Sequence, residues 1–168
     1  SAIQYVEAIN KVGVEEQDTY KDFYIVRRKM EVSDPETGAK LTLLPDDSFS
    51  INSFIEFESK FIHNQSARIE NMDDFAEDIA PARTFVFVRE IEQLRKAGLI
   101  QGGNLENAVV IYEREMSQTA LDELAELIGV PHHDAKELGY LNKKALIFPN
   151  EPARHKGLDI IGDMALVG

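Results

Sequence analysis

Apolar residues recur with a helical period in several segments of the chain. Residues 3–12 carry an apolar side chain at every third position, which predicts a short amphipathic helix that ends at Gly13 and packs on the edge of the domain. Residues 116–129 show the same one-sided pattern over a longer stretch and predict a second amphipathic helix. Residues 88–97 predict another, with Gly98 as the residue that ends it.

Other segments have the composition of strands. Residues 22–32 are rich in β-branched and aromatic side chains, and residues 41–44 follow after a turn that contains Pro and Gly, so the two predict a β-hairpin. Residues 48–58 alternate apolar and polar positions, which indicates a strand with one buried face and a bulge near Ser53. Residues 141–149 predict a strand that leads into the C-terminal segment.

The mixture of helical and strand segments predicts a single α+β domain that covers residues 1–168. With 168 residues and 43% hydrophobic content, the chain is long enough to bury one sizeable core. It lacks an initiator methionine and stops directly after an apolar run. We therefore expect it to be a piece excised from a longer protein.

Charge and composition exclude several classes of function. The formal net charge of −12 repels nucleic-acid phosphates and anionic membranes. No segment approaches the roughly 18 to 20 apolar residues of a membrane span, and the start is unlike a signal peptide, so we expect a cytoplasmic protein. There is no cysteine, so any metal must be held by His, Asp or Glu. The adjacent His132 and His133 lack helical ligand spacing and are interpreted as surface-loop residues.

The C-terminal segment, residues 151–168, contains the candidate chemistry. His155, Asp159 and Asp163 follow one another at four-residue intervals, so on a helix they would project from nearly one face. A neutral imidazole and a carboxylate one turn apart can bind a divalent metal, commonly zinc. The same spacing also suits an ordinary hydrogen-bonded pair on a helix, and the spacing alone does not separate the two interpretations.

Two long motifs carry a family resemblance. The sequence ARHKGLDIIGD at residues 153–163 and the sequence IAPARTFVFVREIEQLRKAGLIQGGNLENAVVI at residues 79–111 resemble, in the same order, those of the UDP-3-O-acyl-N-acetylglucosamine deacetylases. These enzymes are zinc amidases of bacterial lipid A synthesis. The resemblance extends over the whole chain and corresponds to the second half of the enzyme. The family's first domain, which supplies another zinc-ligand histidine and a glutamate base, has no counterpart in this sequence.

The resemblance implies roles for four residues in catalysis. His155 and Asp159 would bind the zinc ion, and Thr84 would donate a hydrogen bond to the oxyanion that forms when the amide is attacked. Asp163 would orient a further histidine that lies beyond the end of this sequence.

The resemblance also implies a substrate site for the UDP-sugar. Arg27 would bind the UDP phosphates, Lys156 would contact phosphate or hexose, and Phe85 would pack against the sugar and acyl chain. Arg27 could equally be a solvated cation on a strand, and Phe85 an ordinary core residue. Further residues would line a hydrophobic tunnel for the acyl chain, although a packed core asks for the same residue types. They are Ile91, Ile100, Gly103, Ala108 and Val110.

The resemblance refines the expected fold and function. It implies a two-layer sandwich in which a small mixed or antiparallel sheet is covered by the helices that contain Glu90 and His155, with an inserted β-α-β acyl-chain element at about residues 99–148. The implied function is zinc-dependent hydrolysis of the N-acetyl group, with the isolated chain inactive because the third ligand, the base and the further histidine are missing. One alternative is a non-catalytic binding or scaffold domain of the same fold. Another is a domain that associates with a separately supplied partner.

Overall fold

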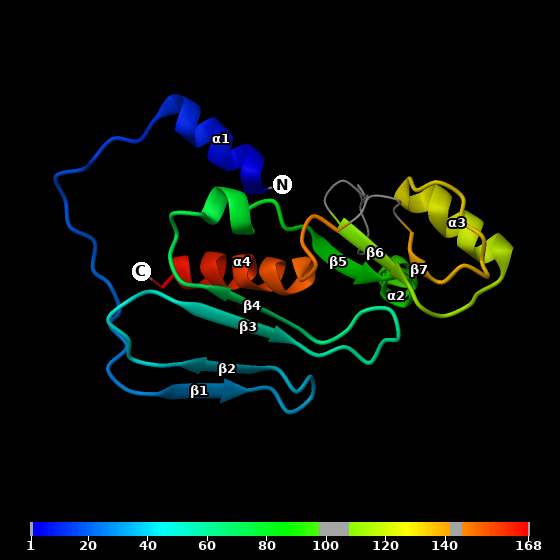
Figure 1. Ribbon diagram of the computed structural model, residues 1–168, viewed down its shortest axis with the longest axis horizontal. Coiled ribbons are helices and arrows are strands. Elements are labelled where there is room, and N and C mark those ends of the chain that lie inside the picture. Colours follow the sequence, from blue (N-terminus) through cyan, green and yellow to red (C-terminus); the bar gives the residue numbers. More distant parts are fainter. Residues whose placement is uncertain (1, 98–107, 142–145, 168) are drawn as a thin grey trace.

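The computed structural model describes residues 2–97, 108–141 and 146–167 of the chain. Within these residues the strands form three small sheets, with the orders β1-β2, β3-β4 and β5-β6-β7, and helices lie beside them (Figure 1). The predicted α+β class is therefore confirmed. The single small sheet of the expected two-layer sandwich is not found in the described part, because the strands divide into two hairpins and a three-stranded sheet.

The predicted N-terminal helix is confirmed as α1, Ala2–Val12, but the packing predicted for it on the edge of the domain is not found. It buries none of its residues, and Tyr5 and Val12 are 75% and 88% exposed. In Figure 1 it lies at the periphery, joined to β1 by a long segment without regular structure. No helix of the described residues is long and apolar enough to cross a bilayer.

The first hairpin is formed by β1, Met30–Ser33, and β2, Lys40–Leu43. The strands are antiparallel, with Met30 opposite Leu43, so the predicted hairpin is confirmed. The predicted strand at residues 22–32 is wrong over most of its length, because it begins only at Met30. Residues 22–29 have no partner strand in the described part of the chain, and β-branched and aromatic composition alone does not form a ladder.

The second hairpin is formed by β3, Ile51–Ile55, and β4, Gln65–Ile69. Its register runs without interruption from Ile51 opposite Ile69 to Ile55 opposite Gln65, so the predicted bulge near Ser53 is wrong. Strand β4 was not predicted. It is short and largely polar, because only one of its faces is buried.

Helix α4, Glu151–Ala165, lies against this second hairpin and the π-helical turn η1, Phe75–Ile79. Its apolar side contributes Leu158, Ile160 and Ile161 to a core. The residues that they cover on η1 and the hairpin are Ile51, Ile69, Ile79 and Phe75.

Two close contacts fix the distance of α4 from the hairpin. The hydroxyl of Ser53 donates a hydrogen bond of 2.7 Å to the carbonyl oxygen of Ala153. At Gly157 a Cβ atom would lie 2.6 Å from the Cδ1 of Ile69, so only glycine fits there without a shift of its neighbours. The N-terminal half of α4 is thereby held against the β3-β4 hairpin.

The third sheet begins with a parallel β-α-β unit. Strand β5, Thr84–Phe87, leads into helix α2, Val88–Lys96, and β5 pairs in parallel with β6, Ala108–Tyr112. Strand β7, Gly139–Tyr140, adds antiparallel to β6. The helix predicted at residues 88–97 is confirmed, whereas Gly98 lies outside the described residues.

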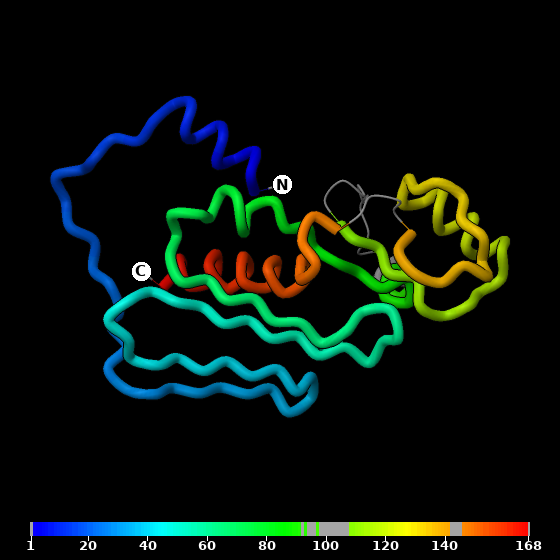
Figure 2. Tube along the Cα trace, in the orientation of Figure 1, coloured from blue at the N-terminus to red at the C-terminus, as the bar shows by residue number. Residues whose placement is uncertain are grey.

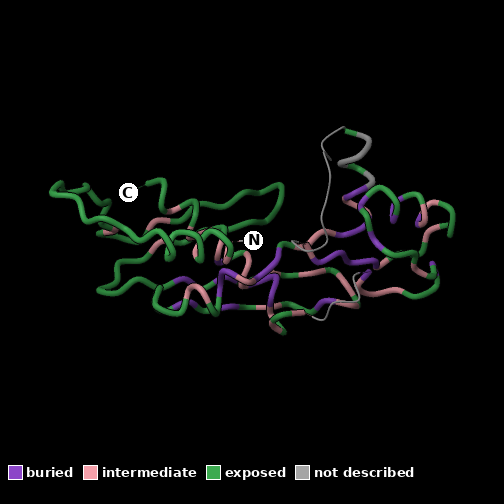
Figure 3. Tube along the Cα trace, turned by 90° about the horizontal axis from the view of Figure 1, so that it is seen from above, coloured by how far each residue is buried: buried purple, intermediate pink, exposed green. Residues whose placement is uncertain are grey.

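Helix α3, Gln118–Ile128, confirms the remaining helix prediction. The hydroxyl of Ser117 caps its N-terminus, and Gly129 ends it with a positive φ of 68°. The strand predicted at residues 141–149 is wrong in its described part, since β7 ends at Tyr140 and residues 146–149 are not in a strand. Figure 3 shows that the buried segments belong mainly to this region and to the β3-β4 region, while α1 is exposed.

Candidate metal and catalytic site

His155 is the central residue of the candidate site. It lies on α4, its side chain is 20% exposed, and its Nδ1 is 3.0 Å from the carbonyl oxygen of Ala82. A carbonyl oxygen can only accept a hydrogen bond, so Nδ1 carries a proton, and in the neutral ring the lone pair is on Nε2. Histidines that bind metals are oriented by the same kind of contact on the ring nitrogen that does not bind the metal.

Asp159 lies one helical turn after His155 and faces the same way. The Nε2 of His155 is 3.5 Å from the Oδ1 of Asp159, which is long for a hydrogen bond. Two ligands of a tetrahedral zinc ion, each about 2.0 to 2.1 Å from the metal, are about 3.3 Å apart. The pair therefore fits two neighbouring positions of a zinc site.

Neither Lys156 nor Asp163 adds a metal ligand to the pair of His155 and Asp159. Lys156 donates a hydrogen bond of 2.9 Å to the Oδ2 of Asp159, so it contacts the candidate ligand while its side chain stays exposed to solvent. Asp163 is exposed and makes no side-chain contact with His155 or Asp159. Of the three polar groups expected to converge, the structure brings two together.

The described residues hold no larger metal-binding cluster. No group of three or more His, Cys, Asp or Glu side chains in residues 2–97, 108–141 and 146–167 could hold a metal ion. The adjacent His132 and His133 contact different partners, the Oδ1 of Asp122 at 3.0 Å and the carbonyl oxygen of Glu137 at 2.6 Å. The Asp122 carboxylate raises the pKa of His132. Within the described residues, His155 and Asp159 would therefore offer only two of the four ligands that zinc usually takes.

A buried ion pair connects the motif at residues 79–111 to the first residue of α4 and was not predicted. The side chains of Arg83 and Glu151 are 5% and 0% exposed, and the Nε of Arg83 is 2.7 Å from the Oε1 of Glu151. The Nη2 of Arg83 donates to Oε2 at 3.0 Å, and the backbone N–H of Ile147 donates to the same oxygen at 2.8 Å. Figure 2 shows how the chain passes from η1 into β5 beside the beginning of α4.

Glu151 is ionised in this environment. Burial raises its pKa, but the hydrogen bonds from the side chain and backbone of Arg83 and from the backbone of Ile147 outweigh burial, and the pKa is lowered below its usual value. Arg83 belongs to the motif at residues 79–111, and Glu151 lies two residues before the motif at residues 153–163. Nothing in the sequence distinguishes a buried charged residue from an exposed one at these positions.

Thr84 lies close along the chain to the contact between His155 and Ala82. It is the first residue of β5, two positions after Ala82, and it is exposed. Its hydroxyl makes no hydrogen bond to any described residue. The hydroxyl is therefore available to a ligand.

The predicted substrate residues lie in different surroundings. Phe85 packs edge-to-face against Phe57, with ring centroids 5.4 Å apart. Ile91 and Val110 are buried in a core that also contains residues of α3, and Ala108 is half-buried. Ile100 and Gly103 lie outside the described residues. The tunnel assignment stays a prediction.

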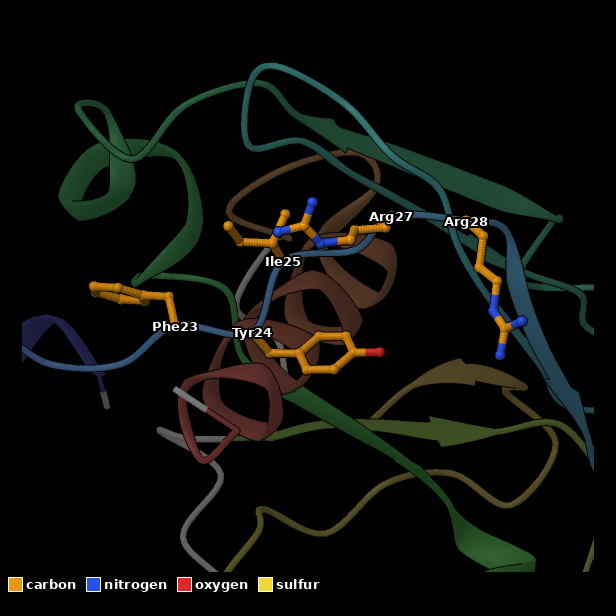
Figure 4. A pocket seen from close by; sticks show the side chains of 5 residues that line it. All are labelled: Phe23, Tyr24, Ile25, Arg27 and Arg28. Carbon is orange, nitrogen blue, oxygen red and sulfur yellow. The ribbon is translucent and has the colours of Figure 1, made fainter.

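Arg27 lies on an irregular segment rather than on the predicted strand. It lines an open hollow of about 510 Å³, and Figure 4 shows its side chain beside Ile25, with Arg28 pointing away along the chain. The residues that line the hollow are Phe23, Tyr24, Ile25, Arg27 and Arg28. Arg27 is exposed, and its contact with UDP stays a prediction.

The comparison with known proteins assigns the family. The sequence profile described as UDP-3-O-acyl N-acetylglycosamine deacetylase, LpxC, matches residues 1–128 and 134–168. The chain belongs to this family. The bifunctional enzymes LpxC/FabZ of Bacteroides thetaiotaomicron and Porphyromonas gingivalis are 55% and 54% identical to it over 168 residues, which is the whole chain and 36% of each relative.

A relative named as a deacetylase alone has a lower sequence identity. The UDP-3-O-acyl-N-acetylglucosamine deacetylase of Myxococcus xanthus is 37% identical over 169 residues, covering the whole chain and 46% of that protein. The chain thus spans between a third and a half of the length of these LpxC relatives.

Proposed function

We propose that this chain is the part of a UDP-3-O-acyl-N-acetylglucosamine deacetylase that supplies two zinc ligands and an oxyanion donor, in bacterial lipid A synthesis. The observation that carries the proposal is the state of His155. Its Nδ1 is engaged by the carbonyl of Ala82, and its Nε2 faces Asp159 at 3.5 Å. Membership of the LpxC family supports the same reaction and substrate class.

The chain's own groups have distinct tasks in this reaction. The zinc ion, when bound, lowers the pKa of a water molecule and polarises the amide carbonyl. Ala82 keeps the proton of His155 on Nδ1, so that Nε2 can act as a ligand, and Asp159 adds a negative charge beside it. Thr84 donates a hydrogen bond to the amide oxygen as it becomes negative, a contact that typically lowers the barrier by about 2.7 to 4 kcal/mol. Asp163 orients a histidine outside this chain.

The substrate contacts follow from the chemistry of the UDP-sugar. Arg27, beside the aromatic residues of its hollow, binds the UDP phosphates, and Lys156 leaves Asp159 to contact phosphate or hexose. Phe85 packs against the sugar and the acyl chain. The tunnel residues, including Ile91 and Val110, accommodate the acyl chain itself.

The chain alone is expected to be inactive. His155 and Asp159 are two ligands where zinc usually takes four, and the general base is a glutamate of the family's first domain. That first domain and the UDP-sugar are thus the proposed partners, in the cytoplasm. The alternative is a non-catalytic scaffold domain, which the 2.9 Å ion pair between Lys156 and Asp159 would also suit.

Substitution of the two ligands distinguishes enzyme from scaffold. His155→Ala and Asp159→Ala should each abolish release of acetate from UDP-3-O-acyl-N-acetylglucosamine and lower the bound zinc, measured on the full-length polypeptide of the source gene. His132→Ala is the matched control, because it also removes an imidazole paired with an aspartate. Unchanged deacetylation in the Asp159 variant would favour the scaffold.

A further inference from the structure

We propose that Glu151 is a positioning residue for the His155 imidazole and acts through the peptide group between Ala82 and Arg83. The inference rests on the proposed function, since it treats His155 as a metal ligand. It assigns a role to a buried carboxylate that the reaction itself does not use.

The contacts join three groups in a row. The backbone N–H of Arg83 donates to the Oε1 of Glu151 at 2.9 Å, and the carbonyl oxygen of Ala82 accepts from the Nδ1 of His155 at 3.0 Å. This N–H and this carbonyl belong to the same planar peptide group and point in opposite directions. Glu151 and His155 are one helical turn apart, a rise of about 6 Å, so one rigid peptide spans the distance between them.

Glu151 is itself rigidly placed. Besides the N–H of Arg83, it accepts hydrogen bonds from the Arg83 guanidinium and from the N–H of Ile147, and its side chain is fully buried. A carboxylate with donors on both oxygens cannot rotate without breaking several charge-assisted bonds. The orientation of the Ala82–Arg83 peptide is therefore fixed by α4, the helix that carries His155.

The charge of Glu151 also reaches the imidazole. A carboxylate that accepts from a peptide N–H polarises the group and makes its carbonyl oxygen a stronger acceptor. That oxygen keeps the imidazole proton on Nδ1 and makes Nε2 more basic, as a directly bonded carboxylate does in zinc sites. Here the Glu151 carboxylate acts indirectly, through the peptide group between Ala82 and Arg83.

A purely structural ion pair would behave differently. If Arg83 and Glu151 only fastened α4 to the start of β5, their loss would lower stability and leave the tautomer of His155 unchanged. A positioning role predicts a change in the tautomer in the folded, metal-free chain. The backbone N–H of Arg83 favours the positioning role, because it engages Glu151 in addition to the guanidinium.

The test uses two variants and a control. Glu151→Gln keeps the shape and removes the charge. The double variant Arg83→Met, Glu151→Met removes both charges, so no buried charge is left without a partner if the single variant fails to fold. Ser53→Ala is the control, because it removes a hydrogen bond to α4 at Ala153 without contact to the Ala82–Arg83 peptide.

Two measurements report on the His155 imidazole: its tautomer and the zinc affinity. Nitrogen-15 NMR of the metal-free chain should show the Nδ1–H tautomer of His155 in the wild type and in Ser53→Ala, and a shift toward Nε2–H in both Glu151 variants. Chelator competition on the full-length polypeptide should show zinc affinity lowered about 10- to 100-fold in the Glu151 variants, the range for loss of a group that orients a ligand. The control should stay within about threefold of the wild type.

The outcomes separate this inference from the proposed function. Folded Glu151 variants with the wild-type tautomer and zinc affinity would overturn the positioning role, while loss of zinc in His155→Ala would still support the ligand assignment. If His155→Ala keeps the wild-type zinc affinity, the proposed function itself is refuted.

Discussion

Gly157→Ala tests how closely α4 must approach the β3-β4 hairpin. The added Cβ would lie 2.6 Å from the Cδ1 of Ile69 and 4.0 Å from the Oγ of Ser53. The first distance is about 1 Å shorter than the roughly 3.5 to 4.0 Å at which carbon atoms attract. Ile69 is 4% exposed and packs with Ile51 and Ile79, so its side chain has little room to rotate away.

The expected change in the free energy of unfolding of Gly157→Ala is the sum of two opposing effects. Overpacking a core by a methyl group typically costs about 1 to 3 kcal/mol, and replacing glycine by alanine inside a helix returns about 1 kcal/mol. We therefore expect Gly157→Ala to lower the free energy of unfolding by about 0 to 2 kcal/mol. Gly162 lies on the same helix with nothing within 4 Å of its added Cβ, so Gly162→Ala should raise stability by about 0.5 to 1 kcal/mol. The difference between the two variants isolates the clash.

Urea unfolding followed by far-UV circular dichroism measures the stability of the three single variants and of one double variant. Ile69→Val removes the Cδ1 atom and alone should cost about 0.5 to 1.5 kcal/mol. Combined with Gly157→Ala, it should cost less than the sum of the single effects, because the methyl group then has space. Equal stability of Gly157→Ala and Gly162→Ala, or strict additivity with Ile69→Val, would refute this account of the packing.

The remaining predictions concern the site and its charges. Thr84→Val should lower kcat of the full-length enzyme about 100- to 1000-fold with little change in KM, measured by steady-state kinetics; a change in KM alone would contradict an oxyanion role. Because the pKa of Glu151 is lowered from 4.5 in the folded chain, its contribution to stability is present above pH 4.5 and is lost as the pH falls through the folded pKa. The free energy of unfolding of the Arg83→Met, Glu151→Met variant should accordingly fall less with decreasing pH than that of the wild type. An equal pH dependence of the two proteins would disprove this. The isolated chain, with only His155 and Asp159 as ligands, should bind zinc at micromolar affinity or weaker by calorimetry, and nanomolar affinity would show that further ligands are present.

Local sequence patterns predicted the helices well and the strands poorly. Helix α3 was predictable because its apolar residues lie on one side and Gly129 ends it in the left-handed conformation. Strand β4 was not, because residues 65–69 are mostly polar and become a strand only by pairing with β3. Residues 22–29 show the converse, a composition suited to a strand without a partner in the described part. Strands depend on contacts far away in sequence, which composition does not encode.

In the candidate site, too, contacts within one helix were predictable and contacts between distant segments were not. The four-residue spacing of His155 and Asp159 was enough to predict that their side chains meet, because a helix fixes that geometry locally. It was not enough for Asp163, whose position one turn further leaves it in solvent. The ion pair of Arg83 and Glu151 joins residues 68 positions apart, so its burial depends on the tertiary fold alone.

The peptide group between Ala82 and Arg83 explains why neither motif forms the site by itself. The C-terminal motif carries the imidazole, but the carbonyl that selects its tautomer belongs to the motif that begins β5. The β5 motif carries Thr84, but the orientation of its backbone depends on Glu151 at the start of α4. In the proposed mechanism, α4 and the start of β5 therefore each supply a contact that orients a group of the other. A change at this junction should alter metal binding and oxyanion stabilisation together.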